Sequence, residues 1–220
     1  MTLIDNRSRS PELRATWGLS IYVEVGERKI LFDTGPSWRI LYENAYKLGV
    51  NLSEVEYVVL SHWHYDHAGA LPNVLSVSNA KAVVPERVRG VIVDEEKIVI
   101  AEKPLQIFEN AITTGALKGR IKEQSLLLIS DRGAIVLTGC AHPGLKTVLK
   151  ASSEICGKIY ALIGGFHISG FEADKALRVI ERYNVEKVSP CHCTSLEAIR
   201  EISLKHRGYI ENGVGTIIEF

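Results

Sequence analysis

The sequence predicts an α/β protein in which layered β-sheets are covered by helices. Three observations predict it: short strands dominate the first part, strands alternate with amphipathic helices later, and polar motifs rich in histidine follow the strands. A change from runs of strands to such alternation is typical of layered sheets with helices outside. With 220 residues, 46% of them apolar, a single domain spanning residues 1–220 is the simplest organisation.

Hydrophobic periodicity and glycine or proline breaks locate the elements. Strands are expected at residues 19–25, 29–32, 56–60, 134–137, 158–162, 186–188 and 215–220. Helices are expected at residues 36–48, 68–77, 144–154, 172–183 and 195–206. Pro36 suits the first turn of the first helix and Gly49 ends it. Residues 81–129 look strand-rich and irregular.

The most informative segment, residues 61–69, reads Ser-His-Trp-His-Tyr-Asp-His-Ala-Gly and follows the strand at 56–60. Its imidazole and carboxylate groups are the donors that Zn²⁺ and neighbouring transition metals prefer. Alternate residues of an extended loop point the same way, so His62, His64 and Asp66 are expected to converge. His67 then faces elsewhere and can serve a second ion.

Four further motifs carry candidate chemistry, and each follows an expected strand. They are Asp33-Thr34-Gly35, the segment 138–144 with Cys140 and His142, the segment Gly164-Gly165-Phe166-His167, and Cys191-His192-Cys193. The ends of strands, and the loops after them, are where sites assemble in layered α/β proteins. The sequence therefore predicts one site built from several strand ends.

Several of these residues have more than one interpretation. Asp33 either orients the histidine loop by hydrogen bonds or caps a turn. His167 binds metal, donates to a substrate phosphate, or satisfies a loop carbonyl. The glycine pair either lets backbone N–H groups approach an anion or forms a tight turn. We favour structural thiols over metal ligands for Cys191 and Cys193. His206, on the last helix, is interpreted as a surface residue.

Charge and hydropathy favour a small-molecule partner. Lys+Arg and Asp+Glu both number 26, and no basic stripe indicates nucleic-acid binding. No apolar stretch approaches the roughly 20 residues that cross a membrane. Residues 1–7 lack the apolar core of a signal peptide, and the cysteines accompany histidine motifs. Only Cys156 of the four cysteines lies outside a histidine motif. We therefore expect a cytoplasmic protein without a disulfide framework; the oligomeric state stays open.

The pattern His-x-His-x-Asp-His, preceded by Asp-Thr-Gly and followed by single histidines, resembles the metallo-β-lactamase fold superfamily. The segments 3–6, 17–20, 31–35, 138–144, 164–167 and 190–194 resemble one subgroup of it. That subgroup includes the 7,8-dihydropterin-6-methyl-4-(β-D-ribofuranosyl)aminobenzene 5′-phosphate synthases of methanopterin biosynthesis. The resemblance implies a four-layer αββα sandwich of two mixed β-sheets flanked by helices.

The resemblance also implies a metal site. One ion takes His62, His64 and His142, and the other takes Asp66, His67 and His192. The superfamily pattern places a bridging Asp where this chain has Cys140, which either ligates as a thiolate or packs. The expected cofactor is Zn²⁺, as one or two ions, with Mn²⁺ or iron as alternatives.

The expected activity is metal-dependent hydrolysis of a small phosphorylated or acyl substrate. Zinc lowers the pKa of its bound water to about 7 and polarises a carbonyl or phosphoryl oxygen. Asp66, His67 and His167 are the candidates for proton transfer and substrate contact. One alternative is the dihydropterin condensation, a transferase reaction that releases diphosphate. Another is a non-catalytic, metal-stabilised binding or sensor protein.

Overall fold

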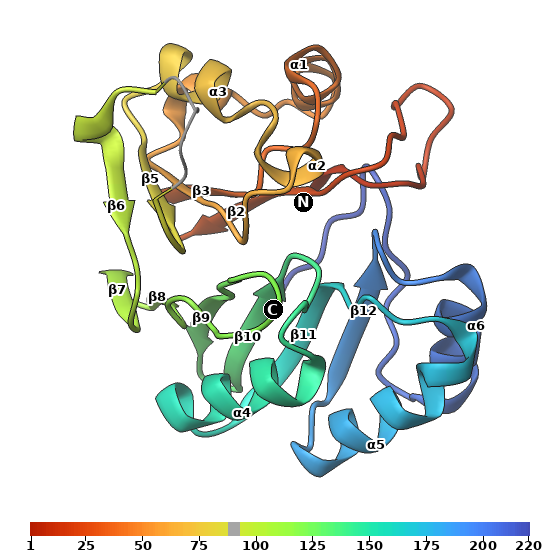
Figure 1. Cartoon of the computed structure of the whole chain (residues 1–220). Coiled ribbons are helices and arrows are strands. Elements are labelled where there is room, and N and C mark those ends of the chain that lie inside the picture. The colour runs from red at the N-terminus through yellow and green to blue at the C-terminus, as the bar shows by residue number, and fades with distance from the viewer. Residues whose placement is uncertain (88–92) are drawn as a thin grey trace. The chain divides into compact units, whose positions relative to one another are not determined.

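The computed structural model describes residues 1–87 and 93–220, and these form two compact units. Unit 1 comprises residues 1–102 with 213–220, and unit 2 comprises residues 103–212. Each unit contains one six-stranded sheet with its own helices (Figure 1). Among the helices of the described residues, the longest has 12 residues, and none is long and apolar enough to cross a membrane.

The sheet of unit 1 has the strand order β1-β2-β3-β4-β5-β6. The strands are β1 (Thr2–Ile4), β2 (Ser20–Val25), β3 (Arg28–Phe32), β4 (Tyr57–Val59), β5 (Lys81–Val84) and β6 (Ile98–Ile100). Pairing is antiparallel from β1 to β3 and parallel from β3 to β6, so the sheet is mixed. Because β3 and β4 are parallel, Asp33 and the histidine loop follow their strands at the same sheet edge.

Helices cover one face of this sheet. They are α1 (Trp38–Lys47), α2 (Tyr65–Ala68) and α3 (Leu71–Val77), with short 3-10 turns at Leu52–Glu54 and Glu95–Lys97. Apolar residues of α1 and α3, such as Leu41 and Val74, share one buried cluster with Leu31 and Val58 of the sheet. The helix expected at 68–77 corresponds to α3 and begins three residues later, because residue 68 ends α2 and residues 69 and 70 form a turn.

The sheet of unit 2 has the order β12-β11-β10-β9-β8-β7. The strands are β7 (Leu105–Phe108), β8 (Ala111–Thr113), β9 (Leu126–Ser130), β10 (Gly133–Thr138), β11 (Ile159–Gly165) and β12 (Lys187–Cys191). The pairs from β7 to β10 are antiparallel, whereas β10, β11 and β12 are parallel neighbours. The three motifs that follow these parallel strands therefore lie at one edge of the sheet.

Helices α4 (Leu145–Cys156), α5 (Ala173–Arg182) and α6 (Leu196–Lys205) belong to unit 2, with a 3-10 turn at Gly170–Glu172 before α5. Val148, Leu177 and Ile202, one from each helix, pack in one cluster with Leu162 and Val188 of the sheet. Burial of such apolar residues is the dominant favourable contribution to folding. The helices therefore fix the strands whose ends carry the histidine motifs.

The strand expected at residues 215–220 was wrong. Val214 forms only an isolated bridge with Ser8. Gly215 donates to the carbonyl of Thr2, and Thr2 donates to the carbonyl of Thr216. Beyond these bonds the segment is largely exposed, including the side chains of Ile217 and Phe220. Its apolar pattern is thus not matched by a partner strand among the described residues.

Candidate metal-binding site

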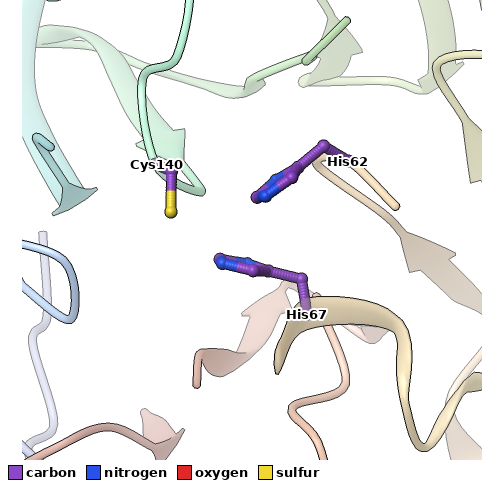
Figure 2. A group of neighbouring side chains, drawn as sticks. All are labelled: His62, His67 and Cys140. Carbon is purple, nitrogen blue, oxygen red and sulfur yellow. The ribbon is translucent and has the colours of Figure 1, made fainter. Parts of the chain in front are cut away.

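The loop after β4 brings three imidazoles together in unit 1. The rings of His62 and His67 are fully buried and their centroids lie 4.1 Å apart (Figure 2). Nε2 of His62 lies 3.0 Å from Nδ1 of His64. Two nitrogens on one tetrahedral zinc ion lie about 3.3 Å apart, given Zn–N bonds of about 2.0 Å. The spacing of these two nitrogens thus suits a shared ion.

We expected His67 to face away from His62, but the two rings lie side by side. The extended conformation ends at His64, and the single helical turn of α2 carries His67 back beside His62. Asp66 lies on the same turn; its Oδ2 is 3.7 Å from Nε2 of His67 and accepts a hydrogen bond of 2.8 Å from Nε1 of Trp17. All four predicted donors of the loop therefore lie in one cluster.

Asp33, fully buried after β3, positions two of these rings. Its Oδ1 accepts from the backbone N–H of Ser61 at 2.7 Å, and its Oδ2 lies 2.7 Å from both Ser61 Oγ and His67 Nδ1. A carboxylate only accepts, so His67 Nδ1 and Ser61 Oγ donate to it. Ser61 Oγ then accepts from Nδ1 of His62, 2.9 Å away. In both rings Nε2 therefore carries the lone pair, and this is the tautomer in which Nε2 can bind a metal ion.

Unit 2 holds a second cluster at the ends of β10, β11 and β12. Its members, all from the predicted motifs, are Cys140, His142, His167, His192 and Cys193. One possible ligand atom from each of Cys140, His192 and Cys193 lies within 4.8 Å of the others, and the same holds for Cys140, His142 and His167. Figure 2 labels Cys140 on the loop after β10. Each group is a candidate metal site within this unit.

Glu123 is the functional residue that sequence reasoning missed. It is 1% exposed, and its carboxylate accepts from the backbone N–H groups of Cys140, Ala141 and His142 at 2.8–2.9 Å. Its Oε2 also lies 2.8 Å from Nδ1 of His142. The sequence offers no signal for this role, because Glu123 stands between Lys122 and Gln124 in what reads as a surface turn.

The backbone is strained at the site loops. Four residues that are not glycine have positive φ there: Asp33 (58°), Ala141 (53°), His167 (48°) and His192 (50°). Such conformations cost about 1–3 kcal/mol each and persist where surrounding structure requires them. Each of these four residues follows the end of a strand that carries a predicted motif, so the strained positions lie at the candidate site.

The glycine pair of the third motif does not form a tight turn but ends a strand. Gly164 and Gly165 end β11, and a side chain on Gly164 would lie 1.9 Å from the carbonyl oxygen of Thr138. A side chain on Gly165 would lie 2.3 Å from the Gly139 oxygen and 2.5 Å from Sγ of Cys193. The N–H of Gly165 donates to Gly139. These glycines are needed because neighbouring chain segments approach β11 closely.

Cys193 and His167 shift each other's pKa. A hydrogen bond from Cys140 lowers the pKa of the Cys193 thiol most, burial opposes this, and a hydrogen bond with His167 lowers the pKa further. The same bond raises the pKa of His167. The pair therefore favours thiolate and imidazolium over two neutral groups.

A cavity of about 450 Å³ opens beside His142 and His167 in unit 2. Leu145, Phe166 and Val179 contribute apolar walls. The cavity is also lined by three exposed cations, Arg120, Lys146 and Lys175, against one acidic residue, Glu172. Its volume lies within the range of small-molecule sites, about 300–1,000 Å³. This mixture of apolar and cationic walls suits a small organic anion.

Comparison with known proteins identifies the fold family. Residues 18–170 match the metallo-beta-lactamase superfamily. The chain belongs to this superfamily. Of the predicted motifs, the match spans Asp33, the histidine loop, His142 and His167. The predicted two mixed sheets with flanking helices are confirmed.

Three known proteins resemble most or all of the chain. The 7,8-dihydropterin-6-methyl-4-(beta-D-ribofuranosyl)-aminobenzene-5′-phosphate synthase of Methanocaldococcus jannaschii is 27% identical, with 82% of each chain covered. A crystal structure described as a metal-dependent hydrolase of the beta-lactamase superfamily has a TM-score of 0.80 at 26% identity, covering 100% of this chain and 97% of the other. The metallo-β-lactamase fold protein YhfI of Bacillus subtilis shares the fold. It is 13% identical and has a TM-score of 0.65, with 99% of this chain and 98% of the other covered.

His206 belongs to none of the candidate metal-binding groups among the described residues. It is half-buried rather than a surface residue. Its Nε2 lies 3.1 Å from the carbonyl oxygen of Val185, and its Nδ1 accepts from the backbone N–H of Gly208 at 3.1 Å. Both ring nitrogens are thus used to hold the chain after α6, which leaves this histidine a structural role.

Proposed function

We propose that this metallo-β-lactamase superfamily member is a metal-dependent hydrolase of small phosphorylated or acyl compounds. The observation that carries the proposal is a repeated arrangement: Asp33 holds Nδ1 of His67, and Glu123 holds Nδ1 of His142. A carboxylate on the second ring nitrogen is the usual partner of a metal-binding histidine, because it fixes the tautomer and raises ligand basicity.

The donor set fits zinc in one or two ions. We assign His62, His64 and His142 to one ion and Asp66, His67 and His192 to the other. Imidazole and carboxylate groups suit Zn²⁺, and Mn²⁺ or iron remain alternatives with the same ligands. A bound zinc ion would supply Lewis-acid polarisation of a substrate oxygen and an acidic coordinated water.

The chain's own residues supply binding and proton transfer. The carboxylate of Asp66, about a fifth exposed, can accept a proton while Trp17 holds one of its oxygens. His167, exposed beside the cavity and with a raised pKa, can donate a proton or bind a substrate anion. We keep His67 as a ligand, because its Nδ1 proton is already bound to the buried Asp33.

The test begins with elemental analysis of the purified protein and of protein reconstituted with zinc, manganese or iron. Activity is then measured against phosphodiester, lactone and thioester panels. We expect the wild type to bind metal and to hydrolyse a substrate of at least one panel. The His62→Ala variant should lose both properties, and His206→Gln, the control, should keep both. Absence of bound metal after reconstitution would contradict the proposal.

A second candidate is the dihydropterin condensation, favoured by the 27% identical synthase. The cations around the cavity suit phosphate or diphosphate groups equally well. Diphosphate release from a dihydropterin diphosphate and a phosphorylated aminobenzene riboside would distinguish this transferase from a hydrolase. A metal-bound protein inactive in every assay would favour the non-catalytic binding or sensor alternative.

A further inference from the structure

We propose that Cys140, His192 and Cys193 form one metal site in which two thiolates bind the ion. The inference deepens the proposed function and rests on it in one respect, because His192 is a ligand in both. It changes the ligands of the second ion: Cys140, at the position where the superfamily pattern has a bridging Asp, and Cys193 bind this ion with His192, in place of Asp66 and His67.

The order of strands brings the two thiols together. Cys140 follows β10 and Cys193 follows β12, with β11 between these strands. Strand β11 ends in Gly165, and the absent side chain there leaves the space that Cys193 Sγ occupies. Cys193 Sγ lies 3.9 Å from the carbonyl oxygen of Cys140. The two sulfur-bearing loops therefore meet over the end of the central strand.

The spacing of the donor atoms fits a tetrahedral ion. The three ligand atoms of Cys140, His192 and Cys193 lie within 4.8 Å of one another. On a tetrahedral zinc with Zn–S bonds of about 2.3 Å and Zn–N bonds of about 2.0 Å, ligand atoms lie about 3.3–3.8 Å apart. Side-chain movements of about 1 Å or less would bring the three ligand atoms from this spacing to the distances of a tetrahedral zinc site.

The turn at His192 selects one thiol of the Cys-x-Cys pair. In an extended strand Cys191 and Cys193 would point the same way. His192 instead has φ of 50°, which ends the strand's alternation. Cys191 stays fully buried in β12, whereas Cys193 is partly exposed. Within the described residues, neither Cys191 nor Cys156 belongs to a group able to hold a metal.

Two thiolates change the expected metal preference. Soft sulfur ligands favour zinc, cadmium and iron over manganese and magnesium, which prefer oxygen. A site of one imidazole and two thiolates keeps a fourth position for another ligand or a substrate, as in zinc sites with three protein ligands. We therefore expect the protein to discriminate against Mn²⁺ at this position.

The experiment is cobalt substitution of the full chain under anaerobic conditions with a phosphine reductant. Thiolate-bound Co²⁺ gives an intense near-ultraviolet charge-transfer band, whereas nitrogen- and oxygen-bound Co²⁺ gives only weak visible bands. We expect the intense band in the wild type and in Cys191→Ser and Cys156→Ser, the matched controls. Cys140→Ser and Cys193→Ser should each lose at least about half of its intensity at equal bound cobalt.

The outcomes separate the two proposals. Bound cobalt without the band in the wild type, or a band unchanged in both Cys140→Ser and Cys193→Ser, overturns the thiolate site and leaves the proposed hydrolase intact. Failure to bind cobalt overturns both. Circular dichroism checks folding of the variants, and the wild-type spectrum decides the question if a serine variant does not fold.

Discussion

Oε2 of Glu123 lies 2.8 Å from Nδ1 of His142 and accepts a hydrogen bond from it. The same carboxylate accepts hydrogen bonds from three backbone N–H groups of the loop that carries His142. One buried acid thus fixes both the loop and the tautomer of the ring. Asp33 acts in the same way on Ser61 and His67 in unit 1. Each unit therefore orients a predicted ligand through a carboxylate that is remote in sequence.

Glu123→Gln should lower metal affinity by about 10–100-fold, because it removes the carboxylate behind His142. The new amide NH₂ would also face backbone donors, which should destabilise the fold by about 1–3 kcal/mol. Titration with a chelator and urea unfolding of the metal-free protein measure the two effects. Glu181→Gln, at an exposed position of α5, is the control. Equal metal affinity in both variants would refute the orienting role.

Asp33→Asn isolates the charge of Asp33 from its backbone strain. Asparagine tolerates the positive φ of 58° at this position, so the loop conformation should survive. The amide oxygen can accept from the backbone N–H of Ser61, but the NH₂ group then faces Nδ1 of His67 and cannot accept its hydrogen bond. We expect at least about tenfold weaker metal binding with a near-normal circular dichroism spectrum. Wild-type metal content under competition with a chelator would be the contrary result.

Gly164→Ala should destabilise the protein strongly, because the added methyl group would lie 1.9 Å from the Thr138 oxygen and φ is 125°. Gly26→Ala is the matched control: its φ is also positive, at 60°, but nothing lies within 4 Å of the added atom. We expect the control to cost about 1 kcal/mol and Gly164→Ala at least about 2 kcal/mol more. Urea unfolding of both measures the difference, and similar midpoints would count against the close approach.

Cys193 should alkylate as a thiolate over a wide pH range in metal-free protein. The hydrogen bond from Cys140, aided by His167, lowers its pKa from 9.0 to about 5. Its reaction with iodoacetamide should therefore stay fast as pH falls from 8 to about 5 and slow below that. Cys156, whose pKa is raised by burial, should react only in alkaline solution. Mass spectrometry of each cysteine measures this, and parallel pH profiles would argue against the lowered pKa.

Lys175→Ala should raise KM for an anionic substrate about threefold to tenfold and leave kcat nearly unchanged, because one partly solvated cation of the cavity is lost. Arg178→Ala, three residues along α5 and outside the cavity lining, should change neither constant. A neutral analogue of the same substrate should be insensitive to both changes. An equal effect on anionic and neutral substrates would show that Lys175 does not recognise charge.

The pattern of strands, helices and donors was accessible from the sequence because each depends on neighbouring residues. Periodicity located β2, β3, α1 and most elements of unit 2 to within a few residues. The density of histidine in residues 61–69 indicated metal chemistry before any fold was known. The single-domain organisation over residues 1–220 and the assignment of ligands to ions stay predictions.

The tertiary structure alone decided what depends on residues far apart in the chain. Glu123 meets His142, Asp33 meets His67, and Cys193 meets Cys140 through strand order and loop conformation, which no local pattern encodes. The same holds for the glycines of β11: a side chain at either position would collide with neighbouring segments of the chain. Local sequence thus determined which chemical groups the strand ends carry, and packing of the strands determined which of those groups touch.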